Sequence, residues 1–173
     1  MANIILVSDG EKNPWYDWIS NELVRRGHSF FYPVFPSVKE GVDAWILALK
    51  DYRKHLDGGS VLIGHGAGRV VVLKVLEEKL REISGAFFVS GKSLGDTFND
   101  FSFDDFDFSI IKGKAKNFFV YGSEADDPKS LKDSEVLADS LGDEVMIFEE
   151  SAYFKKQDKF EDLLIDILSV VES

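Results

Sequence analysis

Cysteine is absent from this 173-residue chain. The absence excludes a disulfide framework, a thiolate nucleophile and a zinc site built on cysteine. It agrees with a reducing compartment, and we expect a cytoplasmic location. Histidine is scarce as well, since the three histidines are His28, His55 and His65 and none follows position 65. Because there is neither a histidine cluster nor a D-x-D-x-D-G loop, we expect no bound metal and no cofactor.

Long hydrophobic runs are also lacking. No apolar stretch approaches the roughly 18 residues of a membrane-spanning helix, so we expect no contact with a membrane. The opening segment, MANIILVSDG, has no basic leader and is typical of a first strand. We therefore expect no signal peptide.

An excess of basic charge is the third absence. The formal net charge is −11. Residues 1–90 carry eleven acidic and eleven basic side chains, whereas residues 91–173 carry twenty acidic and nine basic ones. Such a surface repels phosphate backbones, which excludes nucleic acid as a partner. The plainer interpretation of the charge is solubility, and a basic protein partner is the alternative.

What is present is the patterning of a folded domain. Hydrophobic residues make up 45% of the chain and charged residues 29%, as in ordinary globular proteins. Short apolar runs alternate with segments of helical spacing from end to end. We expect strands at 4–7, 28–34, 60–63, 86–90, 117–121 and 144–148. We expect helices from Pro14 to near Gly27, around 42–49, from the turn after 63 to about Leu80, at 131–141 and at 160–171.

Strands that are apolar throughout and separated by helices predict a parallel sheet covered on both faces. We therefore predict an α/β fold, a three-layer α/β/α sandwich with a mostly parallel sheet of about six strands. A single domain spans residues 1–173, since no linker or internal repeat divides the chain. Ligands bind at the carboxyl ends of the strands in such sheets. The polar segments there are 8–10, 65–67, 90–91, 122–127 and 149–154.

The segment 60–68, reading SVLIGHGAG, has the form of a nucleophile elbow, in which a buried strand turns sharply into a helix. In the G-x-S-x-G pattern the central serine is the nucleophile, and the flanking glycines prevent steric clashes. Gly64 and Gly68 are the flanking glycines here, but the central residue is Gly66. Glycine adopts the strained conformation of this turn readily, so it preserves the turn and deletes the nucleophile.

Several motifs together resemble one family. They are the elbow, the early pair Trp15 and Trp18, the segment YGSEADDP at 121–128 and the segment SAYF at 151–154. In their order and spacing they resemble the small serine hydrolases around retinoblastoma-binding protein 9 and the bacterial YdeN-like proteins. The resemblance covers nearly the whole chain. It implies a minimal α/β-hydrolase fold and a catalytic triad in the order serine, aspartate, histidine.

The resemblance places the triad on positions that no longer carry it. The serine falls on Gly66, the aspartate on Asp126 with Asp127 as the alternative acid, and the histidine on Tyr153, so no catalytic set is intact. Independently of any alignment, no histidine after position 65 is available for the last loop. Tyrosine, with an ordinary pKa of ~10, stays protonated near neutrality and is a poor general base. Ordinary Ser–His–Asp hydrolysis is therefore not expected.

The backbone of the elbow is the remaining candidate for binding. Ala67 begins a helix, and a helix N-terminus suits a carboxylate or phosphate. The resemblance implies a second donor at Gly10 or Glu11, in the family's other oxyanion-hole loop. Arg69, in the first helical turn, has two interpretations. It meets an anionic ligand, or it is an ordinary exposed or ion-paired arginine, for example paired with Asp126.

Other polar residues near the strand ends have plainer interpretations. We expect His65 to pack under the elbow rather than to take part in catalysis. Asp126 and Asp127, with Asp9 nearby, form the kind of carboxylate cluster that hard cations prefer, but no calcium-loop motif surrounds them. Asp126 is more simply a vestigial acid or the cap of the following helix.

Residues 98–108 alternate phenylalanine with acidic residues. As an exposed strand, this segment would present a phenylalanine face and an acidic face to a basic, hydrophobic partner. The interpretation we favour is a lid whose phenylalanines pack over the former cleft.

The sequence thus predicts a catalytically inactive, hydrolase-like protein that acts as a binding or protein-interaction module. Its partner is a protein or a small anionic ligand near the elbow. The alternative is an enzyme of changed mechanism that acts on a small ester or other carbonyl substrate. Such an enzyme would use Asp126, with Tyr153 or Ser123 handling the proton. A small-molecule carrier is a third hypothesis, and it requires an open cleft.

Overall fold

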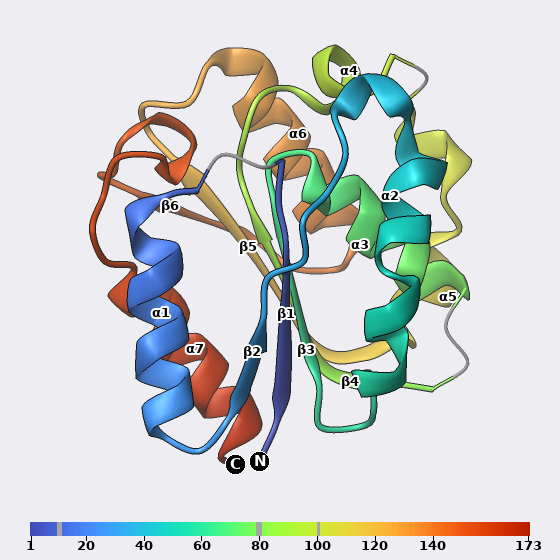
Figure 1. Ribbon diagram of the computed structural model, residues 1–173. Coiled ribbons are helices and arrows are strands. Elements are labelled where there is room, and N and C mark those ends of the chain that lie inside the picture. Colours follow the sequence, from blue (N-terminus) through green and yellow to red (C-terminus); the bar gives the residue numbers. More distant parts are fainter. Residues whose placement is uncertain (10–11, 79–80, 100) are drawn as a thin grey trace.

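The computed structural model describes residues 1–9, 12–78, 81–99 and 101–173. Within them the chain forms a three-layer α/β/α sandwich, with helices on both faces of one central sheet (Figure 1). Two predicted ligand-binding residues, Gly10 and Glu11, lie outside the described residues. So does Leu80, the predicted end of the helix that follows the elbow.

The sheet has six strands, in the order β2-β1-β3-β4-β5-β6, and every neighbouring pair is parallel. The strands are β1 (Asn3–Val7), β2 (Ser29–Phe31), β3 (Val61–His65), β4 (Ile83–Val89), β5 (Ala115–Ser123) and β6 (Val145–Phe148). The predicted α/β sandwich is therefore confirmed. The central strands β4 and β5 are longer than predicted because each has a partner along both edges, whereas the edge strand β2 is shorter.

Two groups of helices cover the sheet. On one face lie α1 (Pro14–Arg25) and α7 (Glu161–Val171). On the other lie α2 (Val42–Ala48), α3 (Gly68–Glu78), α5 (Phe108–Ile111) and α6 (Pro128–Ser140) (Figure 1). The remaining short helices are α4 (Leu94–Thr97), η1 (Val38–Glu40), η2 (Lys50–His55), η3 (Phe103–Asp105) and η4 (Ala152–Phe154). None of the helices in the described residues has the length and hydrophobicity needed to cross a bilayer.

Alternate residues of each strand supply the two cores. In β1, Ile4 and Leu6 pack toward α1 and α7, whereas Ile5 and Val7 pack toward α3, and all four are fully buried. This is the two-residue period of a strand that is buried on both faces. It explains why the strands read as continuous apolar runs.

The strand order locates the site. From β1 the chain crosses to β2 at one edge, whereas from β3 it proceeds through β4 and β5 to the other edge. The connections therefore diverge between β1 and β3, which is the switch point where ligands bind in open α/β sheets. The residues just beyond these two strands are Ser8 and Asp9 on one side and Gly66 on the other.

Candidate functional site

The turn between β3 and α3 has the geometry of a nucleophile elbow. Gly66 stands between the last residue of β3 and the start of α3, with a φ of +59°. This left-handed conformation is costly for most L-residues and free for glycine. The Gly66 N–H donates to the Val89 carbonyl at 3.1 Å, which ties the tip of the turn to the end of β4.

Glycines let this turn pass close to neighbouring backbone. A Cβ on Gly68 would lie 1.9 Å from the Val7 carbonyl oxygen, and one on Gly91 would lie 2.4 Å from the Gly66 Cα. A Cβ on Gly64 would lie 2.9 Å from the Arg69 backbone nitrogen. Gly66 differs, because its Cβ would meet only a side chain, the Asp9 Oδ2 at 3.2 Å. The elbow therefore has room for a side chain at its tip, provided that the Asp9 carboxylate shifts.

The residue before α3, Ala67, has a backbone donor without a partner among the described residues. Within the part of the chain that the structure describes, the Ala67 N–H donates to no backbone carbonyl or side chain, as expected for the first turn of a helix. Ala67 itself is buried. The exposed Asp9 carboxylate beside Gly66 already places a negative charge near this helix end.

Arg69 is buried beneath the elbow, with 1% of its surface exposed. Its Nε donates to the Gly66 carbonyl at 2.8 Å and its Nη2 to the Lys92 carbonyl at 2.9 Å. No carboxylate of the described residues lies within 4.0 Å of the guanidinium. The prediction of an exposed or ion-paired arginine was therefore wrong. The side chain instead satisfies two carbonyls, one at the elbow and one in the loop after β4.

Burial lowers the pKa of Arg69 to about 10, and the more distant carboxylates of Asp133, Asp126 and Asp9 oppose that shift. The guanidinium is consequently charged near neutrality. It provides a buried positive charge under a turn that is lined by acidic side chains.

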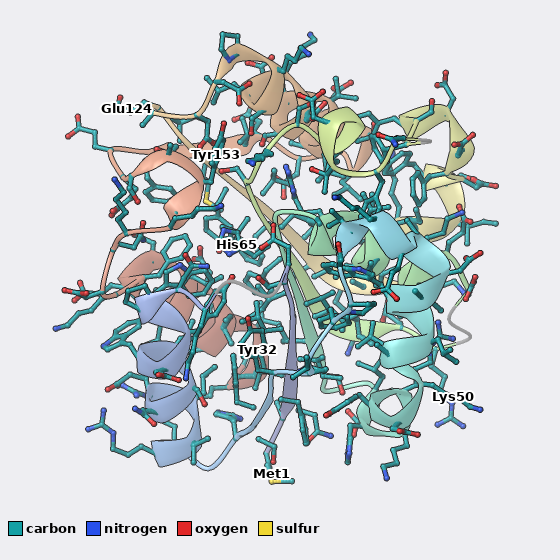
Figure 2. All side chains as sticks on the ribbon, turned by 45° about the horizontal axis from the view of Figure 1, so that its top comes forward. Met1, Tyr32, Lys50, His65, Glu124 and Tyr153 are labelled. Atoms are coloured by element: carbon teal, nitrogen blue, oxygen red, sulfur yellow. The ribbon has the colours of Figure 1, made fainter. Side chains whose placement is uncertain are left out.

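His65 connects the elbow to the loop after β6. Its Nε2 lies 2.6 Å from the Tyr153 carbonyl oxygen, which only accepts, so Nε2 carries the proton. Its Nδ1 then accepts from the Tyr16 hydroxyl, which in turn lies 2.6 Å from the Ser8 hydroxyl. Burial lowers the pKa of His65 to about 4, so the ring is neutral near pH 7. His65 and Tyr153 lie close together at the carboxyl edge of the sheet (Figure 2).

Asp126 and Asp127 have separate tasks. Asp126 is buried, and its two oxygens accept the N–H groups of Ser123 at 2.9 Å and of Tyr153 at 2.7 Å. Asp127 is the N-cap of α6 through the Ser130 N–H at 3.0 Å. The prediction that Asp126 caps this helix was therefore wrong. Asp126 instead joins the end of β5 to the loop after β6.

Tyr153 adopts a strained backbone conformation in η4. Its φ is +61° and that of Phe154 is +56°, and neither residue is glycine. Each such residue costs on the order of 1 kcal/mol. Long-range bonds hold the turn: Asp126 accepts the Tyr153 N–H, and the Trp15 Nε1 donates to the Phe154 carbonyl at 2.7 Å.

The Tyr153 side chain points to the acid loop. Its hydroxyl donates to the Asp127 carboxylate, which raises the pKa of Tyr153 to about 12 and lowers the pKa of Asp127. Both groups are therefore locked in their ordinary protonation states near neutrality. Among the described residues, no group of three or more acidic or histidine side chains is arranged to hold a metal.

A family model described as serine hydrolase matches residues 8–167, which is most of the chain. The chain belongs to the serine hydrolase family. No curated protein sequence matches it.

Solved structures support the same fold. The ydeN gene product of B. subtilis aligns with this chain over 100% of both chains, with a TM-score of 0.87 and 18% identity. A YdeN-like hydrolase from Pectobacterium atrosepticum has a TM-score of 0.69 and 17% identity, over 99% of this chain and 91% of its own. Tomato methylketone synthase I in complex with 2-tridecanone has a TM-score of 0.64 and 14% identity, over 99% and 98% of the two chains. At these identities the likeness shows a small α/β-hydrolase fold.

The fold brings most of the sequence-predicted residues to one edge of the sheet. Gly66, Ala67 and Arg69 are linked through His65 to Tyr153, and Tyr153 contacts both acids, Asp126 and Asp127. One further participant was not predicted, Tyr16, which binds His65. Ser8, which binds Tyr16, and Gly91, which contacts Gly66, lie in the segments 8–10 and 90–91 that were expected at this edge. The position of Ser8 and Gly91 directly after strands was a usable signal. The contact between Tyr16 and His65 left none in the sequence.

The aromatic segment at 98–108 is not a strand. It contains η3 and the start of α5, so the exposed-strand interpretation was wrong. Phe98 and Phe106 are buried in the core on the α3 side, where Phe98 packs edge-on against Trp45 and Phe106 lies under the Lys74 ammonium. These contacts direct the phenylalanines toward α2 and α3. The ring contacts of Phe101, Phe103, Phe106 and Phe108 are with one another. Packing of this segment over the elbow as a lid therefore stays a prediction.

Proposed function

We propose that this serine hydrolase has lost hydrolytic chemistry and acts as a binding or protein-interaction module. Within the family we assign it to the group around retinoblastoma-binding protein 9 and the YdeN-like proteins, with a degenerate triad at Gly66, Asp126 and Tyr153. One observation carries the proposal. The tip of the elbow, with a φ of +59°, carries no side chain, and both ring nitrogens of the adjacent His65 are engaged elsewhere.

The residue at the expected base position supports this proposal. A general base near neutrality needs a pKa close to the working pH. Tyr153 has a pKa of about 12 because its hydroxyl donates to Asp127. The proton therefore stays on the tyrosine, which leaves no acceptor for a nucleophile's proton at that position.

The residue at the expected acid position supports the proposal as well. Both oxygens of Asp126 accept backbone N–H groups, so this carboxylate holds the strained loop at Tyr153. Ser123 is also engaged, since its hydroxyl donates to the Glu150 carbonyl at 2.6 Å and accepts the Ala125 N–H. A changed mechanism through Asp126, Tyr153 or Ser123 on a small ester or carbonyl substrate is therefore the weaker alternative. Tomato methylketone synthase I binds 2-tridecanone, a ketone, which supports a carbonyl compound as the ligand in this alternative.

The contacts at the elbow favour a protein partner over a small anion. The Ala67 N–H has no partner among the described residues, but the Asp9 carboxylate lies beside the same turn and repels a second anion. Two of the three nitrogens of Arg69 already bind carbonyls. We place this function in the cytoplasm, because a chain without cysteine is compatible with a reducing compartment.

Hydrolysis of short p-nitrophenyl esters tests the proposal. We expect no turnover above the background rate for the wild-type chain, and clear turnover would overturn the proposal. The double variant Gly66→Ser/Tyr153→His restores a nucleophile and an imidazole beside Asp126, and we expect more activity from it than from either single change. Gly66→Ala/Tyr153→His is the matched control without the hydroxyl.

A further inference from the structure

A groove of about 660 Å³ is lined by residues of α2, α3 and α4 and by none of the elbow residues 64–68. Residues 38–43, from η1 and the start of α2, form one wall. Residues 96–99 together with 101, 102, 105 and 106, from α4 to η3, form the other wall, and α3 contributes Val70 and Lys74. None of the residues proposed for the degenerate triad lines it.

The groove combines aromatic and aliphatic surface with carboxylates. Its apolar side chains are Val38, Val42, Val70, Phe98, Phe101 and Phe106. Two of its carboxylates, Asp43 and Asp105, come from opposite walls and are exposed. In the described part of the chain, neither has a lysine or arginine partner within 4.0 Å.

The groove already holds one ammonium group. The Lys74 Nζ lies 5.0 Å from the centroid of the Phe106 ring, a cation–π contact, and has no carboxylate partner among the described residues. Lysine at 39 and at 74 gives the groove two positive charges, whereas Glu40, Asp43 and Asp105 give it three negative ones, and a fourth carboxylate, Asp96, is paired with Lys129 at 3.8 Å. Aromatic faces and carboxylates both attract cations, so the balance of charge and ring surface favours a cationic ligand.

We propose that this groove binds a small amphipathic organic cation, an ammonium ion on an aromatic or alkyl body. The body packs on the half-buried side chains of Val38, Val42 and Phe101, and the carboxylates of Asp43 and Asp105 attract the ammonium. The volume falls within the range of small-molecule sites. The positive charge of Lys74 repels a cationic ligand, so removal of that charge is expected to strengthen binding. An anionic ligand would instead depend on Lys74.

Three probes that share one aromatic body test the proposal: 4-phenylbutylammonium, the neutral 4-phenylbutan-1-ol and the anionic 4-phenylbutanoate. Each is titrated into ¹⁵N-labelled wild-type chain and followed by amide chemical shifts. We expect the ammonium to bind more tightly than the alcohol and the alcohol more tightly than the carboxylate. The amide shifts are expected at Val42, Val70 and Phe106.

Variants then assign the carboxylates. Exposed ion pairs are weak, so Asp43→Asn and Asp105→Asn are each expected to weaken ammonium binding by about two- to fivefold. Lys74→Met is expected to strengthen it. Asp104→Asn is the matched control, because Asp104 is the exposed neighbour of Asp105 and does not line this groove.

Four results would overturn the proposal: no shifts with the ammonium up to its solubility limit, equal or tighter binding of the carboxylate, unchanged affinity in Asp43→Asn/Asp105→Asn, or shifts centred on Ala67. None of these results concerns ester hydrolysis, so each of the two proposals, the cation-binding groove and the loss of catalysis, can be overturned without the other.

Discussion

His65 and Tyr153 form the central contact of the site. The imidazole lies next to the elbow in sequence, yet its two nitrogens bind Tyr16 and the Tyr153 carbonyl. A residue that is often taken as a base is here a neutral connector between α1, the elbow and the last loop. Protonation of His65 is therefore expected to change the free energy of unfolding rather than a catalytic rate.

The pH dependence of unfolding tests this role of His65. The unfolded chain takes up a proton at the ordinary histidine pKa of 6.5, whereas the native ring does so only near its lowered pKa of about 4. Stability contributed by the neutral ring is therefore present above pH 6.5 and is lost as the pH falls from 6.5 to about 4. The loss is roughly 2 kcal/mol by pH 5.

Urea unfolding at pH 7 and pH 5 measures that loss. His65→Gln is expected to be less stable than the wild type at pH 7 but to lose about 2 kcal/mol less between the two pH values. The carboxylates contribute equally to the pH dependence of stability in the two proteins, so their contribution cancels in the comparison. An identical decline in the two proteins would contradict a buried, neutral His65.

Gly66 itself tests the room at the tip of the elbow. Gly66→Ser must adopt a positive φ and move the Asp9 carboxylate, which lies 3.2 Å from the new Cβ. We expect a loss of about 1 kcal/mol in the free energy of unfolding. We also expect no esterase activity, because both nitrogens of His65 are engaged and Tyr153 keeps its proton near neutrality. Gly66→Ala is the matched control for the strain. Ester hydrolysis by Gly66→Ser alone would show that a base had been overlooked.

At the scale of elements, the crossing of β1 and α3 depends on glycine. Gly68 lets the start of α3 approach Val7 at the end of β1, and Gly91 lets the loop after β4 touch Gly66. Backbone atoms cannot move aside as a flexible side chain can. Gly68 and Gly91 are therefore needed for the packing of the backbone, whereas Gly66 determines that the tip of the elbow has no side chain.

Alanine substitutions separate these two kinds of glycine. Gly68→Ala is expected to cost about 3 kcal/mol or more, because its Cβ would lie 1.9 Å from a carbonyl oxygen. Gly95→Ala, in α4 with nothing within 4 Å of its Cβ, is expected to be neutral or slightly stabilising. Thermal unfolding of the two variants gives the comparison. Similar melting temperatures would contradict the close approach of α3 to β1.

The same distinction explains what sequence alone could predict. β3 and α3 were predictable because a buried strand, two glycines and a helical stripe adjoin one another along the chain. The conformation of Tyr153 was not, since it depends on contacts with His65, 88 positions away. Its neighbour Phe154 likewise accepts from Trp15, 139 positions away. Likewise, neither a strand nor a helix pattern indicated that Arg69 is buried.

At the scale of the whole molecule, the α/β-hydrolase fold surrounds an elbow that has glycine at its tip. The six strands, the switch point and the elbow geometry remain, and the acid loop still contacts the last loop. The acidic excess is confined to residues 91–173, the half that includes one wall of the groove. We propose recognition as the use of this fold, and the groove beside α3 is the second surface that we propose for a ligand.

Labelling with a fluorophosphonate probe, followed by intact-mass measurement, tests the loss of catalysis most directly. The probe reacts with an activated serine, whatever the natural substrate. The account predicts that the folded wild-type chain keeps its unmodified mass, whereas Gly66→Ser/Tyr153→His gains one adduct at position 66. A stoichiometric adduct on any serine of the wild-type chain, Ser8 and Ser123 included, would contradict it.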